Sequence, residues 1–455
     1  MELEGYDFSA HIHLFTCRGR NFLLDVNSGA IHLLDRTAVD LVDKIIQNKG
    51  FSGLVLDGMP CGSGEIEETL MELKAASDEG SLFSYPEKIT VNFQQMHIKA
   101  LCLNVAHLCN MNCVYCFAHQ GAFGKNKGLM PWLVAKAAVD FLITASADIK
   151  NLEIDFFGGE PLLNFEVVKQ TVAYGRSKEL KNGKKINFTL TTNGVLLNDE
   201  AQDFIIDNDI SVILSLDGRP EINDAKRVLN NGEGSYHRIL PNFRKMVAKK
   251  PVSYYIRGTY TRDNTDFSRD LAHMAEQGFK NISLEPAVGA DLELAIKERD
   301  LPAVLAEYEN LTGVLLEAYH KGREISFFHY NLDLQKGPCL AKRNSGCGAG
   351  TEYAAVTPEG DIYPCHQFIG KDEFKMGNVI DKRVDRLLSD RFAGSNLNNK
   401  SRCEACWARY FCGGGCHANH YFTNNDLLKP VEVSCSMHKK RIEQAIYLDI
   451  EKKLT

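Results

Sequence analysis

The chain has 455 residues, of which 44% are apolar, so it can bury several cores and is long enough for two or three domains. Its net charge of −7 is spread over both signs, which argues against nucleic acid or an anionic membrane as a partner. The sequence has no apolar run of about 18 residues, the length that a membrane span requires. The start MELEGYDFSAH is acidic and polar, so we expect a soluble, cytoplasmic protein.

Residues 1–90 are predicted to form a small separate domain. The segments 11–19 and 21–35 are predicted as short strands, with a hairpin turn at Asn27, Ser28 and Gly29. Residues 36–50 and 65–80 have apolar positions at helical spacing, and glycine ends the first of these helices. Strands and two helices without a cluster of catalytic-type residues indicate a binding module.

A different sequence pattern begins near residue 98 and continues to about 330, in which apolar strands alternate with amphipathic helices. The predicted strands are 98–106, 151–157, 186–193, 210–218, 252–261 and 281–286, and helices such as 131–147, 164–180 and 266–278 separate them. Six strand–helix units predict an α/β fold with a parallel sheet curled into a partial (β/α)6 barrel like part of a TIM barrel. In that architecture, chemistry lies at the carboxyl ends of the strands.

From residue 335 to about 440, glycine, cysteine and turn residues dominate, and a final helix is predicted over 441–455. A segment this irregular cannot be stabilised by a hydrophobic core alone and needs cross-links such as disulfides or metal sites. The chain has 14 cysteines, and eight of them lie after residue 338. In a long chain without a signal peptide, this density favours metal or cluster ligation over disulfides.

Three cysteines, Cys109, Cys113 and Cys116, follow the first barrel strand with the spacing C-x3-C-x2-C. Three thiolates can hold three irons of a [4Fe–4S] cube and leave the fourth open, whereas a simple electron carrier uses four cysteines. The trio therefore predicts a cluster that binds a substrate or cofactor. The alternative is a zinc site completed by His107 or His119.

The same spacing, with Tyr115 directly before the third cysteine, resembles the signature of radical S-adenosylmethionine (SAM) enzymes. The resemblance implies that the open iron chelates the amino and carboxylate groups of SAM. It also implies that an electron from the cluster cleaves the sulfonium into methionine and a 5'-deoxyadenosyl radical. Tyr115 is then expected near the adenine.

Gly158, Gly159 and Glu160 end the second predicted strand. Glycines let a ligand approach the backbone, and the carboxylate offers an acceptor for an ammonium group. Alone, these residues are typical of an ordinary turn. One βα unit after the cysteine loop, they resemble the GGE motif of radical SAM enzymes, which contacts the methionine amino group.

Polar residues at further strand ends match the same family. By resemblance, the residues that line the ribose and carboxylate of the cofactor are Asn193, Ser215 and Asp217. Arg227 and Arg257 are candidates for binding a cofactor or substrate carboxylate. Helix capping and turn formation remain alternatives for Asp217 and for Thr192, which directly precedes Asn193.

The tail resembles the SPASM extension of radical SAM enzymes, in which seven cysteines hold two auxiliary [4Fe–4S] clusters. The resemblance assigns the first cluster to Cys347, Cys365 and Cys416, and the second to Cys403, Cys406, Cys412 and Cys435. Cys339 is a candidate fourth ligand of the first cluster, unless that iron is open for a substrate cysteine. A zinc ribbon made by Cys403, Cys406, Cys412 and Cys416 is the alternative, but it leaves the other three without a purpose.

The N-terminal domain resembles the winged-helix-like leader-recognition (RRE) domain of ribosomal-peptide maturases, which adds a peptide strand to its sheet edge. Across its whole length the chain resembles maturases of six-cysteine peptides (the SCIFF group). This implies a radical SAM peptide-modifying oxidoreductase of an anaerobe that needs an external reductant such as flavodoxin or ferredoxin. It further implies a thioether between a cysteine sulfur and a carbon of another residue in a cysteine-rich precursor peptide, after hydrogen abstraction by the 5'-deoxyadenosyl radical.

Two other functions remain open at this point, and no catalytic acid or base is singled out. An anaerobic sulfatase-type maturase, which makes formylglycine, shares the SPASM pattern. Such enzymes start close to their cysteine loop, whereas 108 residues precede Cys109 here. A non-catalytic iron–sulfur electron carrier is the candidate from another class, but it has no use for an open iron or a GGE motif.

Overall fold

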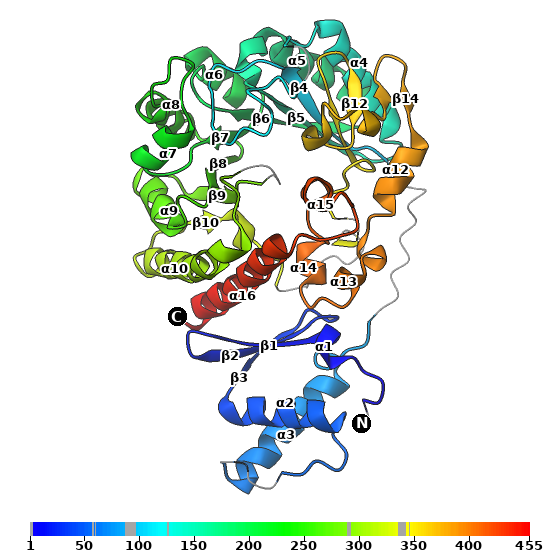
Figure 1. Ribbon diagram of the computed structural model, residues 1–455, viewed down its shortest axis with the longest axis vertical. Helices are drawn as coiled ribbons and strands as arrows, with labels where there is room; N and C mark the ends of the chain where they lie inside the picture. Colours follow the sequence, from blue (N-terminus) through cyan, green and yellow to red (C-terminus); the bar gives the residue numbers. More distant parts are fainter. Residues whose placement is uncertain are drawn as a thin grey trace.

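The computed structural model describes residues 3–56, 59, 61–86, 97–124, 127–288, 293–334, 343–344 and 346–455. It has three parts, seen from bottom to top in Figure 1. A small N-terminal domain lies below, a curved sheet covered by helices lies above, and a cysteine-rich part lies to one side between them. The final helix crosses the middle of the molecule.

The N-terminal domain contains the predicted strands and helices. Its elements are α1 (Phe8–His11), β1 (Ile12–Cys17), β2 (Arg20–Asp25), β3 (Ile31–Leu34), α2 (Arg36–Asn48) and α3 (Ser63–Asp78). The strands form an antiparallel sheet in the order β1-β2-β3, so β3 has a strand neighbour on one side only. Asp35 caps α2 by accepting a hydrogen bond from the Ala38 N–H, and the apolar face of this helix buries Leu41 and Ile45.

The middle part confirms the predicted α/β fold with a mainly parallel sheet. Its strands are β4 (Ala100–Ala106), β5 (Asn151–Gly158), β6 (Lys185–Thr192), β7 (Ser211–Ser215), β8 (Tyr254–Tyr260) and β9 (Asn281–Pro286). The helices are α4 (Trp132–Ala145), α5 (Phe165–Asn182), α6 (Asp199–Asp207), α7 (Pro220–Lys226), α8 (Tyr236–Ala248), α9 (Phe267–Glu276) and α10 (Leu301–His320). They cover the outer, convex face of the sheet in Figure 1.

Burial alternates along the strands, as a sheet with one packed face requires. In β5, the side chains of Leu152, Ile154 and Phe156 are fully buried, whereas Glu153 is exposed and Asp155 half-buried on the inner face. The inner face of the sheet is therefore partly open and polar, which suits a barrel that closes incompletely around a ligand.

The sheet extends further than the sequence predicts. The short strand β10 (Ser326–Phe327) pairs with β9, and β11 (Tyr353–Val356) joins β4 in parallel from the cysteine-rich part. Three more strands continue the sheet, each antiparallel to its neighbour: β12 (Asp361–Tyr363), β13 (Gly377–Asn378) and β14 (Arg383–Val384). Strands of two to four residues are too short to give a periodic pattern, so they are not recognisable in the sequence.

The last helix, α16, spans Glu432–Leu454 and thus begins before the predicted boundary at 441. Pro430 lacks an N–H and lies just outside the first turn, where proline is compatible with a helix start. As a result, Cys435 lies on this helix. The remaining helices of the cysteine-rich part are α12 (Arg386–Ala393), α13 (Ser401–Glu404), α14 (Arg409–Cys412) and α15 (His417–Asn424).

The N-terminal domain contacts the cysteine-rich part through β1 and the residues just before it. The His13 ring stacks on Trp407 with centroids 3.6 Å apart, and its Nε2 lies 3.0 Å from Glu443 of α16. The buried Arg409 of α14 donates to the Ala10 carbonyl at 2.6 Å and to Asn27 Oδ1 at 2.8 Å. These contacts fix the domain at the lower edge of the cysteine-rich part (Figure 1).

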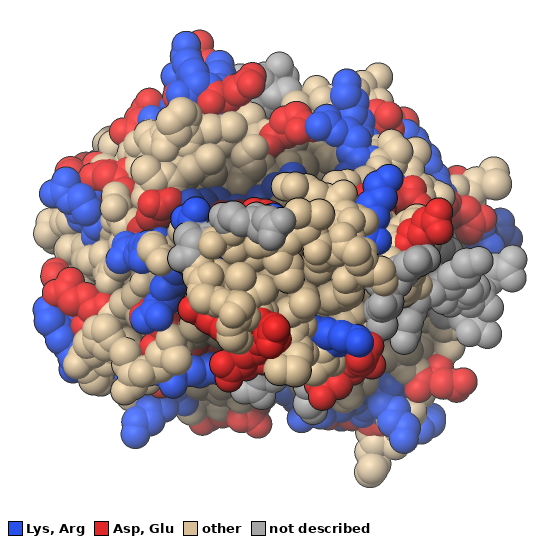
Figure 2. Space-filling model, turned by 90° about the horizontal axis from the view of Figure 1, so that it is seen from below, with Lys and Arg blue, Asp and Glu red and all other residues tan. Residues whose placement is uncertain are grey.

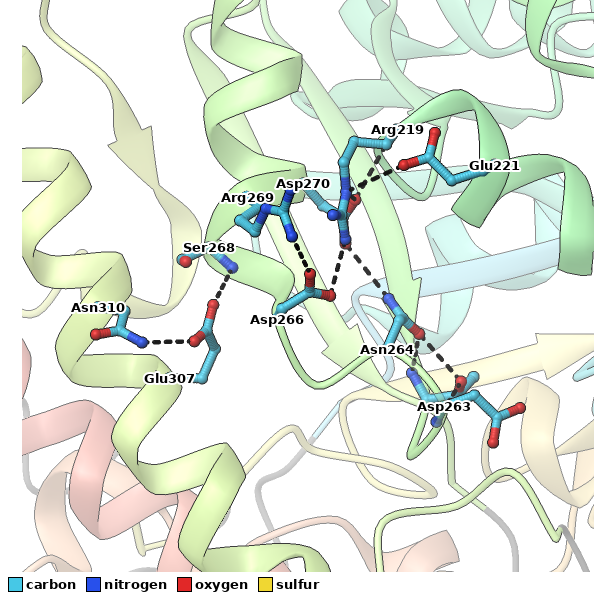
Figure 3. A network of polar contacts seen from close by, with 11 residues as sticks. Arg219, Glu221, Asp263, Asn264, Asp266, Ser268, Arg269, Asp270, Glu307 and Asn310 are labelled. Atoms are coloured by element: carbon cyan, nitrogen blue, oxygen red, sulfur yellow. Dashed lines mark hydrogen bonds and ion pairs between the residues drawn. The ribbon is translucent and has the colours of Figure 1, made fainter.

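The loop after β7 is held by the polar network in Figure 3. Arg219 donates to Asp270 Oδ1 and Asp266 Oδ1, each at 2.8 Å, and so ties this loop to α9. A Cβ on Gly218, whose φ is +133°, would lie 2.3 Å from the Asp270 Cβ, so only glycine fits at this position. The network therefore fixes the backbone next to Asp217.

Charges of both signs are interspersed around a largely uncharged centre on the face that Figure 2 shows. No patch of one sign dominates this face, as expected from the small net charge. Among the helices of the described ranges, none combines the length and the apolar character that crossing a bilayer requires.

Candidate functional site: three groups of cysteines

A cavity of about 220 Å³ lies at the carboxyl ends of the parallel strands. The predicted residues that line it are Cys109, Cys113, Tyr115, Cys116, Gly158, Gly159, Asn193, Ser215, Arg227 and Arg257. They come from the loop after β4 and from β5 to β8 and the loops after them. Two further predicted residues, Glu160 and Asp217, lie behind this lining and are almost fully buried.

Gly158 and Gly159 line the cavity, and the neighbouring backbone is a further reason for glycine at both positions. A Cβ on Gly158 would lie 2.3 Å from the Ala106 carbonyl oxygen, and one on Gly159 would lie 2.1 Å from that of Leu108. The missing side chains therefore make room for the backbone that leads into the cysteine loop. The glycines fix Cys109 against the end of β5.

The three cysteines of the loop are half-buried, and Arg227 is the cation that acts on one of them, Cys113. Burial raises the pKa of Cys109 to about 12 and that of Cys113 to about 11, so both are neutral thiols near pH 7 unless a cation binds. In the described residues, no three His, Cys, Asp or Glu side chains converge as a set that could hold one metal ion. A cavity lined by three cysteines would suit an iron–sulfur cluster, in which each thiolate binds a different iron.

Asp217 supports the cavity from behind instead of lining it. Its Oδ2 accepts a hydrogen bond of 2.5 Å from the Tyr115 hydroxyl, and its Oδ1 accepts from Arg227 Nε and from the Thr259 N–H, both at 2.9 Å. The Arg227 guanidinium also lies over the Tyr115 ring, 5.5 Å from its centroid. Asp217 thus orients two predicted cofactor-binding side chains.

Glu160 is fully buried and accepts hydrogen bonds from the Thr192 hydroxyl and the Asn193 N–H, both at 2.8 Å. Burial raises the pKa of Glu160 to about 7, although these donors act in the opposite direction. An ammonium group next to this carboxylate would offset the cost of its burial. Asn193 in turn donates to Asn110 Oδ1 at 2.7 Å, within the cysteine loop.

Two residues of the lining, Glu285 and His366, have no signal in the sequence. Burial alone would raise the pKa of Glu285, but His329, followed by Arg441 and Arg257, holds it well below its usual range. His329 Nε2 contacts Glu285 Oε1 at 3.1 Å, while Arg441 lies at its Nδ1, so a neutral His329 donates to the carboxylate. Burial lowers the pKa of His366 to about 4.

Both residues come from elements distant in sequence. Glu285 lies near the end of β9, and His366 lies in the cysteine-rich part, next to Cys365. Neither belongs to a local motif, because long-range packing alone brings them to the cavity. A pattern of acceptors at every strand end is the one signal that could have indicated Glu285.

A second cavity, of about 80 Å³, lies in the cysteine-rich part. Among its lining residues are Cys403, Cys406, Cys412 and Cys435, the four cysteines predicted to bind one auxiliary cluster. They come from α13, the turn after it, α14 and α16. Burial raises the pKa of Cys435 to about 12 and that of Cys403 to about 11, again as expected for thiols that lack a bound cation.

Cys347, Cys365 and Cys416 form a third group. Cys365 interacts electrostatically with the other two, and burial raises its pKa well above the usual range. Cys347 Sγ also lies 3.9 Å from Nδ1 of His417. Cys339, the candidate fourth ligand of this group, lies outside the described residues.

Two family models match the chain. Residues 103–273 match the radical SAM superfamily, and residues 347–407 match the iron–sulfur cluster-binding SPASM domain. The chain therefore contains a radical SAM domain followed by a SPASM domain. These domains imply SAM and iron–sulfur clusters, as the cysteine groups predicted.

The relatives are distant but similar over most of their length. The chain is 29% identical to an uncharacterized protein (MJ0907) of Methanocaldococcus jannaschii over 317 residues, 69% of this chain and 96% of the relative. It is 25% identical to the cysteine-type anaerobic sulfatase-maturating enzyme of Clostridium novyi, covering 68% and 85% of the two chains. It is 27% identical to the mycofactocin maturase MftC of Mycobacterium ulcerans, covering 72% and 86%.

Two kinds of solved structure share the fold. Native anSMEcpe with bound AdoMet has a TM-score of 0.65 at 23% identity and covers 78% of this chain and 99% of its own. Streptococcus suis SuiB bound to the precursor peptide SuiA has a TM-score of 0.51 at 16% identity and covers 90% and 95%. The part of the chain after the N-terminal domain, residues 100–455, makes up 78% of its length. Because the match to SuiB covers 90% of the chain, it extends into the N-terminal domain.

Proposed function

We propose that the chain is a radical SAM maturase that forms an intramolecular thioether in a ribosomally made, cysteine-rich peptide. The observation that carries this proposal is the combination of an open, three-cysteine cavity with a second cysteine cavity and a docked N-terminal domain. Relatives named as maturases of a peptide or protein support the general class. The thioether rests on the resemblance of the whole chain to the SCIFF group.

Cys109, Cys113 and Cys116 would hold a [4Fe–4S] cluster that, when bound with SAM, supplies the reducing electron and a 5'-deoxyadenosyl radical. Cys347, Cys365 and Cys416 would hold one auxiliary cluster, and Cys403, Cys406, Cys412 and Cys435 a second. The chain itself orients and shields the reactants. Asp217 holds Tyr115 and Arg227 in place, and Glu160 offers its carboxylate to the SAM ammonium.

Arg257 and Glu285 provide opposite charges on the far side of the same cavity. Arg257 lines the cavity and acts electrostatically on Glu285, and its guanidinium would be available to a carboxylate of SAM or of the peptide. Glu285 is held ionised and turned toward His329, which keeps a negative charge fixed beside the cavity. Closing a C–S bond removes one hydrogen from carbon and one from sulfur, so the product keeps its sulfur.

We further propose that the leader of the precursor binds at the free edge of β3. An exposed sheet edge accepts a peptide as an added strand, and tethering then raises the concentration of the core peptide at the cavity. The similarity to SuiB, which was solved with its precursor peptide, supports this role because it extends into the N-terminal domain.

The leader site has a direct test. Leu33 lies in β3 with 43% of its surface exposed. A Leu33→Asp change should weaken binding of the full precursor about tenfold, since the introduced carboxylate would have to be desolvated at the added strand. Val55→Asp, at a 68% exposed position of the same domain, is the matched control. Equal affinities of both variants, measured by fluorescence anisotropy, would exclude β3 as the leader site.

The cofactor assignment is tested by iron content and by SAM cleavage. Anaerobic reconstitution should give about 11–12 irons per chain, as three clusters require. Incubation with SAM and dithionite should release 5'-deoxyadenosine, and Cys113→Ala should abolish the release. About four irons, zinc in place of iron, or an active Cys113→Ala protein would each refute the three-cluster proposal.

Formylglycine formation is the second candidate, because the chain is similar to cysteine-type anaerobic sulfatase-maturating enzymes. That similarity covers 68% of the chain, and the structural match to anSMEcpe covers 78%. A maturase of that kind therefore leaves the N-terminal domain without a role. The non-catalytic carrier is weaker still, since a carrier needs no cavity of about 220 Å³ at its cysteines.

A further inference from the structure

Lys400 is a buried lysine in the cysteine-rich part, between Leu397–Asn399 and α13. Only 1% of its surface is exposed. Its ammonium donates a hydrogen bond of 3.0 Å to the Gly414 carbonyl. Gly414 belongs to a run of three glycines that joins Cys412 to Cys416, and these two cysteines are assigned to different auxiliary clusters.

The backbone conformation of Gly414, next to Lys400, favours glycine. Gly414 has a φ of +83°, and a Cβ there would lie 3.4 Å from Lys400 Nζ and 3.2 Å from Leu397. The Lys400 backbone is fixed as well, because its carbonyl accepts the Cys403 N–H at 2.7 Å. The lysine is thus connected to ligand-bearing segments of both clusters.

The charges that act on Lys400 come from cysteines of both groups. Cys403 and Cys412 of one group, and Cys347 and Cys416 of the other, all favour its charged form when they are thiolates. Burial acts in the opposite direction and lowers the pKa of Lys400. Within the described part of the chain, its ammonium forms no ion pair with a carboxylate, and a backbone carbonyl is its acceptor.

A buried ammonium that has only a carbonyl partner is costly, because it loses its hydration without gaining a counter-charge. Two [4Fe–4S] clusters would provide that counter-charge, since the thiolates of their cysteines outweigh the net positive charge of the iron–sulfide core. Net charge and nearby charges are among the factors that set the potential of such clusters. A fixed cation close to both clusters favours their reduced, more negative forms.

We propose that Lys400 is the shared counter-cation of the two auxiliary clusters and raises the reduction potential of both. This inference rests on the proposed presence of those clusters. It makes Lys400 a positioning residue for electron flow: its charge makes both auxiliary clusters better electron acceptors, while the cluster of Cys109, Cys113 and Cys116 is unaffected. Removing the charge should therefore change two potentials and leave the third unchanged.

The test compares the midpoint potentials of the three clusters by EPR-monitored redox titration of the reconstituted full chain. Lys400→Met removes the charge, Lys400→Gln also retains a donor for the Gly414 carbonyl, and Lys400→Arg retains the charge. Lys429→Met removes an exposed lysine of the same part of the chain and is the control for net charge.

Both neutral variants should make reduction of the two auxiliary clusters at least tenfold less favourable, which is a fall of about 59 mV for a one-electron couple. In the neutral variants, the equilibrium constant for reduction of the third cluster should stay within about twofold of the wild-type value. In Lys400→Arg and Lys429→Met, the same should hold for all three clusters. Unchanged auxiliary potentials in a neutral variant that holds all three clusters would overturn the proposed role of Lys400. The proposed function would not be affected by that result.

Cluster loss is also informative. Loss of the auxiliary iron from both neutral variants, with full iron in Lys400→Arg, would support the counter-cation role, because charge is what the two neutral variants share. Loss from all three Lys400 variants would overturn it in favour of a packing role. Wild-type protein with only about four irons would refute the auxiliary clusters themselves and with them this inference.

Discussion

Asp217 connects three segments behind the main cavity. Its two oxygens accept from the Tyr115 hydroxyl of the cysteine loop, from Arg227 after α7, and from the Thr259 N–H of β8. Its side chain is completely buried, and that of Arg227 is 10% exposed, so this is an ion pair inside the protein. Breaking such a pair from one side leaves the other charge buried and unpaired.

An Asp217→Asn change should therefore destabilise the protein by about 3–5 kcal/mol and disorder Tyr115. The control is Asp266→Asn, because Asp266 also pairs with an arginine but is 40% exposed. That change should cost about 1 kcal/mol or less. Thermal unfolding of both proteins measures the difference, and similar midpoints would show that the Asp217 pair is not structurally important.

Among the individual site residues, the sequence predicts those that lie in local motifs. The three loop cysteines were predicted from their spacing, and they do line one cavity. Glu285 and His366 were missed because they reach the cavity through packing between distant segments. Lys400 gives no signal either, since a lysine in an irregular segment is usually exposed.

Strand β5 shows how an element positions the site. Its buried face belongs to the hydrophobic core that also contains residues of α4 and α5, while Asp155 on the other face lies opposite Cys102 of β4 and Thr189 of β6. Burial raises the pKa of Asp155 to about 6. The inner face thus carries a carboxylate that the fold holds at a cost.

This cost makes stability depend on pH. A carboxyl whose pKa is higher in the folded state binds more protons there, so the free energy of unfolding falls as pH rises from about 3.8 to about 6. Asp155→Asn should remove that part of the slope and stabilise the protein at pH 7 by about 1–2 kcal/mol. Melting temperatures of both proteins between pH 4 and pH 7 test this, and a difference that does not change with pH would contradict it.

Element boundaries were predicted where apolar periodicity is long, as in β5 or α4, and missed where it is short. The strands β11 to β14 have two to four residues each and derive their stability from pairing rather than from a pattern. The start of α16 was predicted too late because its first turn carries cysteine and polar residues instead of an apolar stripe.

In the whole molecule, the cysteine-rich part lies between the N-terminal domain, which is the candidate peptide-binding domain, and the main cavity. His13 of β1 stacks on Trp407, which directly follows Cys406, and also contacts Glu443 of α16. The N-terminal domain is therefore held next to the second cysteine cavity. If the proposed leader site is correct, docking of this kind would keep a bound leader at a fixed distance from the main cavity.

A His13→Ala change should loosen this docking by about 1–2 kcal/mol, which corresponds to a factor of 5–30 in the population of the undocked state. Hydrogen exchange of β1 amides should become faster by the same factor. His32→Ala is the control, since His32 contacts the Ser81 carbonyl within the N-terminal domain. Unchanged exchange in β1 would show that the His13 contacts do not hold the domain.

The central claim is thioether formation in a cysteine-rich peptide, and mass spectrometry of the peptide product tests it most directly. The reconstituted full chain is incubated with SAM, dithionite and the precursor peptide, with the Cys113→Ala protein as control. We expect a peptide that has lost two hydrogens per cross-link, has kept all of its sulfur and resists thiol alkylation at the linked cysteine. A peptide that has lost sulfur, as in formylglycine, or one of unchanged mass would contradict it.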